Sequence, residues 1–182
     1  SRRREERLRL FGRAVEATGH GVTVADVRVP DEPIIYANAG FTEITGYPLG
    51  EVLGQNCRFL QGENTDEATV DTLRHAIDAG EPASVEILNY RRDGTPFWNR
   101  LEVVPICDEA GELTHYLGLQ RDITEQVRNE QRLAVLDRIL RHNVRNKTNV
   151  IRGYAEAITE GGMDAATAAE RIVDAADELY TI

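Results

Sequence analysis

The chain has 182 residues, of which 41% are hydrophobic, and a formal net charge of −10. This length and apolar content suffice for one packed domain with an appendage, which excludes global disorder. The acidic balance disfavours phosphate-rich surfaces, so we expect neither nucleic acid nor a membrane as a partner. Lys147 is the one lysine among 21 basic residues. With the excess of acids, this composition suggests a salt-adapted organism or a GC-rich genome, and favours the first.

The chain carries no targeting or metal-binding signal. No apolar run approaches the roughly 20 residues that cross a bilayer. Cys57 and Cys107 are the two cysteines. Two isolated cysteines fit a reducing compartment, so we expect a cytoplasmic protein without disulfides. Cys107 precedes the turn sequence 108–111 and is interpreted as a strand-end residue. We expect no metal site.

Helical and extended patterns alternate along the first two thirds of the chain. An amphipathic helix is predicted over 5–18 and ends at His20-Gly21. β-Rich runs predict strands at 22–26 and 34–38, joined by the loop Pro30–Pro33. Glycine and proline residues break the helical pattern of the segment that follows, 39–61.

A clear amphipathic helix is predicted over 66–79, with Gly80 as its C-cap. Three strands follow, at 83–91, 95–107 and 113–121, and short turns of the hairpin type link them. The order of elements predicts an α+β domain. A five-stranded antiparallel sheet carries helices on one face, and a ligand can bind between the layers.

The last third of the chain reads as two helices. From Glu125 to about Thr159, apolar residues recur every three or four positions as a coiled-coil-like seam: Leu133, Leu136, Leu140, Val144, Ile151, Tyr154 and Ile158, with Lys147 among them. Gly161-Gly162 predicts a turn, and Asp164 caps a second helix. Its predicted apolar face consists of Ala166, Ala169, Ile172, Ala176 and Leu179. Such a hairpin has little core alone, so we expect a homodimer through these C-terminal helices.

The octapeptide Gly54-Gln55-Asn56-Cys57-Arg58-Phe59-Leu60-Gln61 resembles the signature of light-oxygen-voltage (LOV) domains. These are flavin-binding blue-light sensors of the PAS superfamily. The resemblance runs from about Val22 to Thr124, and the order of elements is that of a PAS fold. Asp122-Ile123-Thr124 resembles the motif that closes PAS domains and begins an output helix.

The resemblance implies a site for flavin mononucleotide (FMN). Arg58 and Arg74 suit its phosphate, because a guanidinium engages phosphate oxygens in pairs. Amides suit the ring edge, because they both donate and accept hydrogen bonds. The expected cofactor-binding residues are Asn56, Cys57, Arg58, Leu60, Gln61, Arg74, Ile77, Asn89, Asn99, Leu101, Val103, Tyr116 and Gln120, with Thr23 and Ala25 also facing the pocket.

Single members of this set have ordinary explanations. A lone cysteine on a helix is usually a small buried apolar residue, and strand amides usually face solvent. One cysteine, two arginines and five amides at the family's spacing favour a flavin site. The resemblance then implies a reversible bond between the sulfur of Cys57 and flavin carbon C4a after blue-light excitation. It also implies a signal that leaves through Gln120.

The sequence 139–149 resembles the phosphoacceptor box of sensor histidine kinases, in a form like that of haloarchaeal kinases, with His142 as the acceptor. A neutral imidazole is nucleophilic near pH 7. Asn143 stands where the commoner box has an acid, and no proline follows. The resemblance implies an ATP-binding domain and a response regulator as partners. No nucleotide-binding motif occurs in the 182 residues, so we expect no autophosphorylation by this chain alone.

These patterns predict a flanking helix at 1–19, a LOV domain at 20–124, a signalling helix at 125–138 and a dimerisation and phosphotransfer hairpin at 139–182. Blue-light sensing that feeds a histidine kinase is the leading interpretation. Two alternatives remain open. One is a flavin-based redox-sensing PAS module in which Cys57 is incidental, and the other is a dimerisation adaptor without a cofactor.

Overall fold

The computed structural model describes residues 12–13, 15–17 and 19–179. It divides into two compact units, 1–127 and 128–182. Most of the flanking helix predicted at 1–19 lies outside the described residues. Within that range, the described residues 12–13 and 15–17 are helical.

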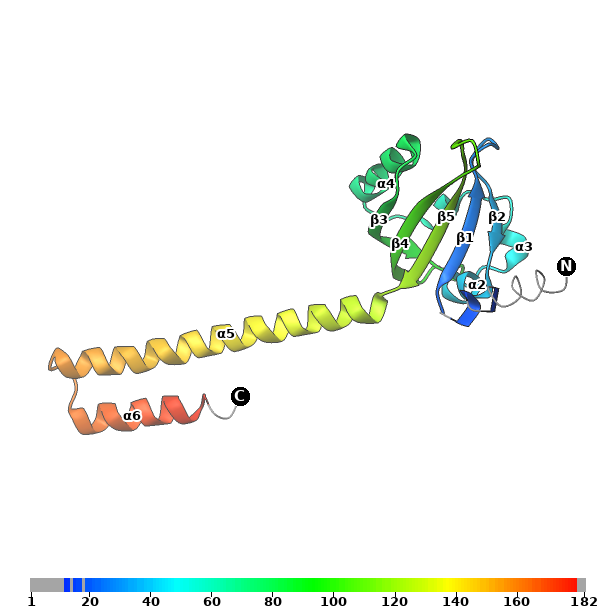
Figure 1. The fold of residues 1–182 in the computed structure, drawn as a ribbon. Helices are drawn as coiled ribbons and strands as arrows, with labels where there is room; N and C mark the ends of the chain where they lie inside the picture. The colour runs from blue at the N-terminus through cyan, green and yellow to red at the C-terminus, as the bar shows by residue number, and fades with distance from the viewer. Residues whose placement is uncertain (1–11, 14, 18, 180–182) are drawn as a thin grey trace. The chain divides into compact units, whose positions relative to one another are not determined.

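The first unit is built on a five-stranded antiparallel sheet (Figure 1). Its strands are β1 (Gly21–Asp26), β2 (Ile34–Ala37), β3 (Ala83–Tyr90), β4 (Pro96–Cys107) and β5 (Leu113–Asp122). Their order across the sheet is β2-β1-β5-β4-β3, so the first and last strands of the chain segment pair at the centre. The predicted α+β class and PAS fold are confirmed, and each predicted strand is present to within one residue at either end.

Four short helical elements connect β2 to β3. They are α2 (Ala39–Thr45), α3 (Leu49–Val52), the 3-10 helix η1 (Cys57–Leu60) and α4 (Glu67–Ala79). β2 ends before Asn38 because this side chain caps α2, where its Oδ1 accepts from the amide of Phe41 at 3.0 Å. The same Oδ1 accepts from the amide of Val22 at 2.7 Å, which ties the cap to β1.

Two apolar clusters hold the helices against the sheet. The first contains Ile34, Ala37, Phe41, Val52 and Leu60 and joins β2 to α2, α3 and η1. The second contains Ile87, Leu101, Val103 and Tyr116, and α4 packs against it through Val70, Leu73 and Ile77. The two clusters leave space between η1, α4 and the sheet, where the candidate site lies.

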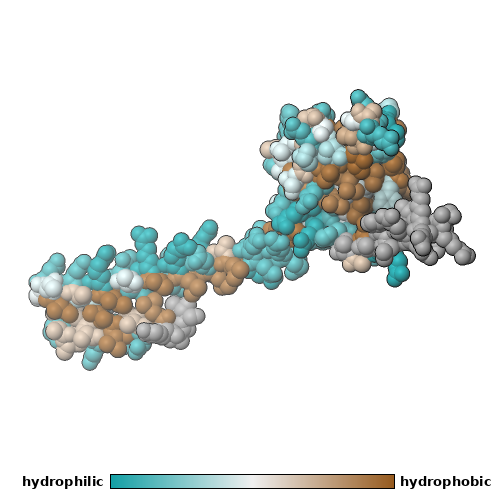
Figure 2. Space-filling view, in the orientation of Figure 1, coloured by the Kyte–Doolittle hydropathy of each residue, from teal (hydrophilic) through white to brown (hydrophobic). Residues whose placement is uncertain are grey.

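The second unit contains most of α5 (Thr124–Thr159) and α6 (Ala165–Asp177). Asp164 caps α6 by accepting from the amide of Ala166 at 2.9 Å, and Lys147 forms an ion pair with Glu178 near its end. Figure 2 shows apolar surface along the facing sides of this hairpin and polar surface on the opposite side of α5.

The predicted apolar face of α6 is confirmed for Ile172, Ala176 and Leu179, which are half-buried, and is wrong for its first two alanines. Ala168 and Ala175 are the buried residues of the helix, whereas Ala166 and Ala169 are exposed. Alanines occur on several sides of this helix, so the apolar pattern alone did not define a single face.

Among the described residues, no helix is long and apolar enough to cross a membrane.

Candidate functional site

A cavity of about 500 Å³ lies between the sheet and the helices. This volume is in the range of small-molecule sites, about 300–1,000 Å³. Strands β1, β3, β4 and β5 form one wall, and η1 and α4 form the other. All thirteen residues predicted to bind the cofactor line it, as do Thr23 and Ala25.

The apolar part of the wall comes from both layers. Leu60 of η1 is 2% exposed, and Leu101, Val103 and Tyr116 of the sheet are also buried. The hydroxyl of Tyr116 donates to the carbonyl of Ile77 at 2.9 Å, which joins β5 to α4 across the cavity. These residues form a surface suited to a planar apolar ring.

Three buried amides lie on neighbouring strands of the cavity wall. Asn99 Nδ2 on β4 donates to Asn89 Oδ1 on β3 at 3.0 Å. Gln120 Nε2 on β5 donates to Thr23 Oγ1 on β1 at 3.2 Å. Within the described chain, Asn99 Oδ1 and Gln120 Oε1 are buried without a hydrogen-bond partner. A buried acceptor without a hydrogen bond costs about 1–3 kcal/mol of folding free energy. A ligand that donates a hydrogen bond to each oxygen would remove this cost.

Cys57 is the first residue of η1 and lines the same cavity. Asn56 precedes the helix, and its Oδ1 accepts from the amide of Arg58 at 3.0 Å. This cap orients the turn that carries the thiol. Burial in apolar surroundings raises the pKa of Cys57 to about 12. The sulfur therefore carries its proton near neutral pH, as a thiol rather than a thiolate.

Two guanidinium groups lie at the more open part of the cavity. Arg58 Nη1 pairs with Asp31 Oδ1 at 2.5 Å, and Arg74 Nη1 pairs with Asp71 Oδ1 at 2.9 Å. Both arginine side chains are more than half exposed. A guanidinium has five donors, so each retains capacity for phosphate oxygens.

The side chain of Asn56 has a structural role beside its predicted one. Its Nδ2 donates to the carbonyl of Asp31 at 2.8 Å, and its Oδ1 is used by the cap. Gln61 lies at the end of η1 and lines the cavity.

Sequence reasoning missed several lining residues, namely Ile34, Val70, Leu73, Ile87, Gly118 and the acids Asp31, Glu32 and Asp78. Simple periodicity could have found most of the apolar ones. Val70, Leu73 and Ile77 follow helical spacing with Arg74, and Ile87 and Gly118 lie two residues from Asn89 and Gln120. Nothing in the local sequence marks the three acids.

His142 lies on α5 in the second unit and is exposed, as predicted. Asn146, one turn later, places Nδ2 at 3.3 Å from both nitrogens of the imidazole ring. An exposed imidazole with a neighbouring amide is accessible to a phosphoryl donor.

The cavity residues fit a flavin. Its ring system offers both N–H and carbonyl groups, which suit the two unpartnered oxygens and the neighbouring amide donors. The apolar wall suits the ring faces, and the two arginines suit a phosphate. No cluster of histidine, cysteine and acidic side chains among the described residues could hold a metal ion.

Comparisons with known proteins place this site in a family. The PAS domain family matches residues 20–125. Blue-light-activated histidine kinase 1 of Erythrobacter litoralis (strain HTCC2594) is 41% identical over 155 residues, which are 85% of this chain and 43% of that protein. The chain thus spans less than half the length of this curated relative.

Solved structures are similar as well. The LOV domain from the Erythrobacter litoralis EL346 blue-light activated histidine kinase has a TM-score of 0.55 and 43% identity, covering 57% of this chain and 95% of that one. An RNA-binding light-oxygen-voltage receptor has a TM-score of 0.65 and 43% identity, covering 73% of this chain and 38% of that one. The expectation that nucleic acid is excluded as a partner therefore gains no support. The chain belongs to the PAS domain family and, within it, to the LOV domains, whose solved members include blue-light photoreceptors.

Proposed function

We propose that this domain senses blue light through bound FMN and that Cys57 is its photoreactive residue. The observation that carries the proposal is the pair of buried, unpartnered oxygens of Asn99 and Gln120 in the cavity that Cys57 lines. Acceptors left without a donor inside a protein indicate a polar ligand. The neutral thiol of Cys57, which lines the same cavity, supplies a reactive group.

Bound FMN would supply absorption of blue light and, once excited, a ring carbon, C4a, to which sulfur can add. Cys57 would contribute both parts of its S–H bond to the excited ring, the sulfur to that carbon and the proton to ring nitrogen N5. The capped turn of η1 orients the thiol toward the cavity, which favours a near-attack arrangement. No base is required, because the thiol keeps its proton until the reaction. The reaction would be reversed thermally in the dark and would give no net turnover.

Gln120 is the proposed route out of the site. Protonation of the flavin at N5 would turn an acceptor into a donor, and Gln120 could respond by rotating its amide. Only Arg121 separates Gln120 from Asp122, the last residue of β5, whose Oδ1 accepts from the amide of Thr124 at 2.9 Å at the start of α5. A rotation at Gln120 therefore acts two residues before Asp122, which caps the output helix, and four residues before Thr124, where that helix begins.

The proposed output is a histidine kinase in two-component signalling, with His142 as the phosphoacceptor. An ATP-binding domain would phosphorylate His142, and a response regulator would receive the phosphoryl group. The support is the exposed imidazole on α5 and the histidine kinase among the relatives.

A homodimer through the C-terminal helices is part of the proposal. Leu133, Leu136, Leu140 and Val144 follow one another along α5 and are 45–66% exposed. A partner helix that covers this stripe would remove its apolar surface from water. Leu136→Glu with Leu140→Glu should convert a dimer to a monomer in sedimentation experiments. Val173→Glu, at another exposed apolar position, is the control. A monomeric parent chain would contradict the dimer.

One absorption experiment tests the sensing function. The purified chain should be yellow, should lose its blue-light absorption on illumination and should recover it in the dark. Cys57→Ala should retain the flavin and lose the reversible bleaching. A yellow protein that bleaches equally without Cys57 would favour the redox-sensing alternative. A colourless chain that releases no flavin on denaturation would favour the adaptor.

A further inference from the structure

The cavity is lined by more acids than bases. Asp31, Glu32 and Asp78 line it together with Arg58 and Arg74, which leaves a formal excess of one negative charge. A phosphate group adds a further charge of about −1.5 to −2 near pH 7. The residues that attract phosphate are therefore outnumbered by residues that repel it.

Asp31 is the acid that is bound directly to a phosphate-binding candidate. Its Oδ1 pairs with Nη1 of Arg58 at 2.5 Å, and its carbonyl accepts from Nδ2 of Asn56 at 2.8 Å. The loop between β1 and β2 is thereby fixed to the turn that carries Cys57. Asp31 has φ of 68° and Glu32 has φ of 48°. Left-handed backbone is unfavourable for most residues, and among residues other than glycine, aspartate and asparagine tolerate it best.

Arg74 offers a natural comparison. Its partner Asp71 lies three residues earlier on α4, and the pair is as exposed as that of Arg58 and Asp31. Asp71 does not line the cavity, whereas Asp31 does. The two ion pairs thus differ in one relevant respect, the position of the carboxylate relative to the ligand.

We propose that Asp31 is a specificity-determining residue that competes with the ligand's phosphate for Arg58. Its carboxylate lowers the affinity for FMN and leaves the affinity for riboflavin, which has no phosphate, unchanged. The ratio of the two affinities is thereby set by the loop between β1 and β2. This inference rests on the proposed flavin site and adds a determinant of which flavin it selects.

Asp31→Asn is the diagnostic substitution. Asparagine tolerates the left-handed backbone, and the carbonyl that accepts from Asn56 remains. Only the charge is removed. Removing one like charge beside a partly exposed phosphate should raise FMN affinity by about three- to tenfold at low salt. In about 1 M salt, where the screening length is about 3 Å, the gain should shrink toward zero.

The test is a fluorescence titration of the full chain, stripped of flavin, with FMN and separately with riboflavin. Asp31→Asn should raise the FMN affinity alone, and Asp71→Asn should change neither affinity by more than about twofold. Asp31→Gly, which adopts this φ freely, should behave like Asp31→Asn. Unchanged riboflavin binding shows that each variant is folded.

Two outcomes separate failure of this inference from failure of the flavin site. If the parent chain binds both flavins and Asp31→Asn leaves the affinity ratio unchanged or lowers it, Asp31 does not compete for Arg58. An equal gain in Asp71→Asn would also overturn the assignment. If the parent chain binds neither flavin, the proposed function fails and this inference fails with it.

Discussion

Gln120 on β5 and Thr23 on β1, 97 residues apart in sequence, share a hydrogen bond of 3.2 Å from Nε2 to Oγ1. The bond fixes which end of the Gln120 amide faces Thr23. It leaves Oε1 as a buried acceptor with no partner among the described residues. One side chain thus joins the two central strands and presents an unused polar atom inside the domain, which makes it suited to report a change in a bound ligand.

Gln120→Leu should separate photochemistry from signalling. Leucine fills a similar volume and has no amide to rotate, so reversible bleaching should persist. The light-dependent change in hydrogen exchange at the start of α5 should fall severalfold. A full-sized change in Gln120→Leu would show that the signal leaves β5 by another route. Hydrogen exchange of dark and illuminated samples measures this change in the parent chain and in Gln120→Leu.

Gly118→Ala should disrupt the contact between Thr23 and Gln120. A Cβ at this position would lie 2.5 Å from Thr23 Oγ1 and 3.0 Å from Gln120 Nε2, so one of them must move. Overpacking of this kind costs about 1–3 kcal/mol of folding free energy. Gly50→Ala is the control, because its Cβ would meet no atom within 4 Å. Thermal unfolding should show a loss for Gly118→Ala alone, and equal stability of the two variants would contradict the tight packing.

Asp122 should stabilise the start of α5 by two separable contacts. Its Oδ1 accepts from the amide of Thr124 at 2.9 Å, and its Oδ2 pairs with Arg91 at 2.7 Å. Burial opposes its ionisation, but the hydrogen bonds from Thr124 and Arg91 hold its pKa below the ordinary value. Asp122→Asn keeps a cap and loses the ion pair, whereas Asp122→Ala loses both.

Asp122→Ala should therefore cost about 1 kcal/mol or more in the stability of the helix start, and Asp122→Asn should cost less. Amide exchange of residues 124–127 measures the difference. Identical exchange in the two variants would show that the cap contributes nothing beyond the ion pair.

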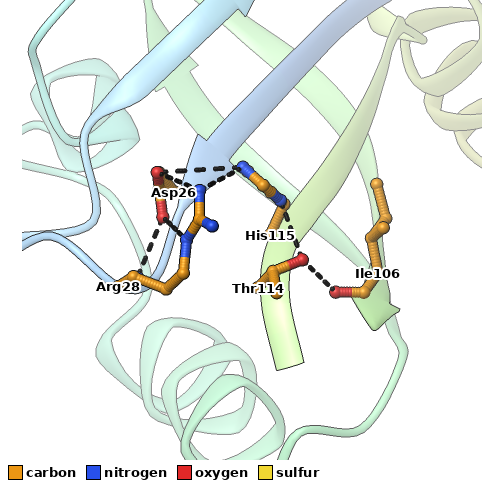
Figure 3. Close-up of polar contacts among 5 residues, drawn as sticks. All are labelled: Asp26, Arg28, Ile106, Thr114 and His115. Carbon is orange, nitrogen blue, oxygen red and sulfur yellow. Dashed lines mark hydrogen bonds and ion pairs between the residues drawn. The ribbon is translucent and has the colours of Figure 1, made fainter. Parts of the chain in front are cut away.

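Asp26 should make the stability of the first unit depend on pH in acid. Its carboxylate accepts from Arg28 Nε at 2.9 Å and Nη2 at 2.8 Å, and His115 Nε2 lies 3.8 Å away (Figure 3). The hydrogen bond from Arg28 is the main cause that lowers the pKa of Asp26 to about 2, from 3.8. A lowered pKa in the folded state gives stability that is present above the unfolded value and is lost as pH falls through the folded one.

Asp26→Asn should accordingly be less stable than the parent chain at about pH 7, with the difference shrinking between about pH 4 and pH 2. Denaturant titrations at several pH values measure it. Arg28→Gln should reproduce the effect, since it removes the other half of the contact. A difference that stays constant down to about pH 2 would contradict the linkage.

Much of the fold could be predicted because the caps, apolar faces and turn residues in the sequence agree with the tertiary structure. The helix of residues 67–79 has a capping aspartate, an apolar face and a terminal glycine with φ of 70°, and all three features stand in consecutive sequence. The hairpin at Arg91–Thr95 closes through Gly94, with φ of 83°. Ala166 and Ala169 were wrongly placed on the apolar face of α6 because alanine occurs on several sides of that helix.

The candidate site was predictable for a different reason. Cys57, Asn89, Asn99 and Gln120 each have an ordinary explanation when taken alone, and it was their joint resemblance to the LOV pattern that predicted the site. The contact of Asp31 with Arg58 joins residues that are 27 positions apart in sequence. It also depends on left-handed backbone at Asp31 and Glu32, which are not glycines, and no local sequence pattern predicts that conformation. Long-range geometry of this kind comes from tertiary packing and is read from the structure alone.

The central claim is that the thiol of Cys57 reacts when the bound flavin is illuminated. Infrared spectroscopy of the S–H stretching band tests it directly. Cys57 and Cys107 are the only two cysteines of the chain, so Cys107→Ser leaves one S–H group. The pKa of about 12 predicts that this group is protonated in the dark near neutral pH. Illumination of the Cys107→Ser chain should bleach the flavin and remove the S–H stretching band, and both should return in the dark. A bleached flavin with an unchanged S–H band would contradict the account.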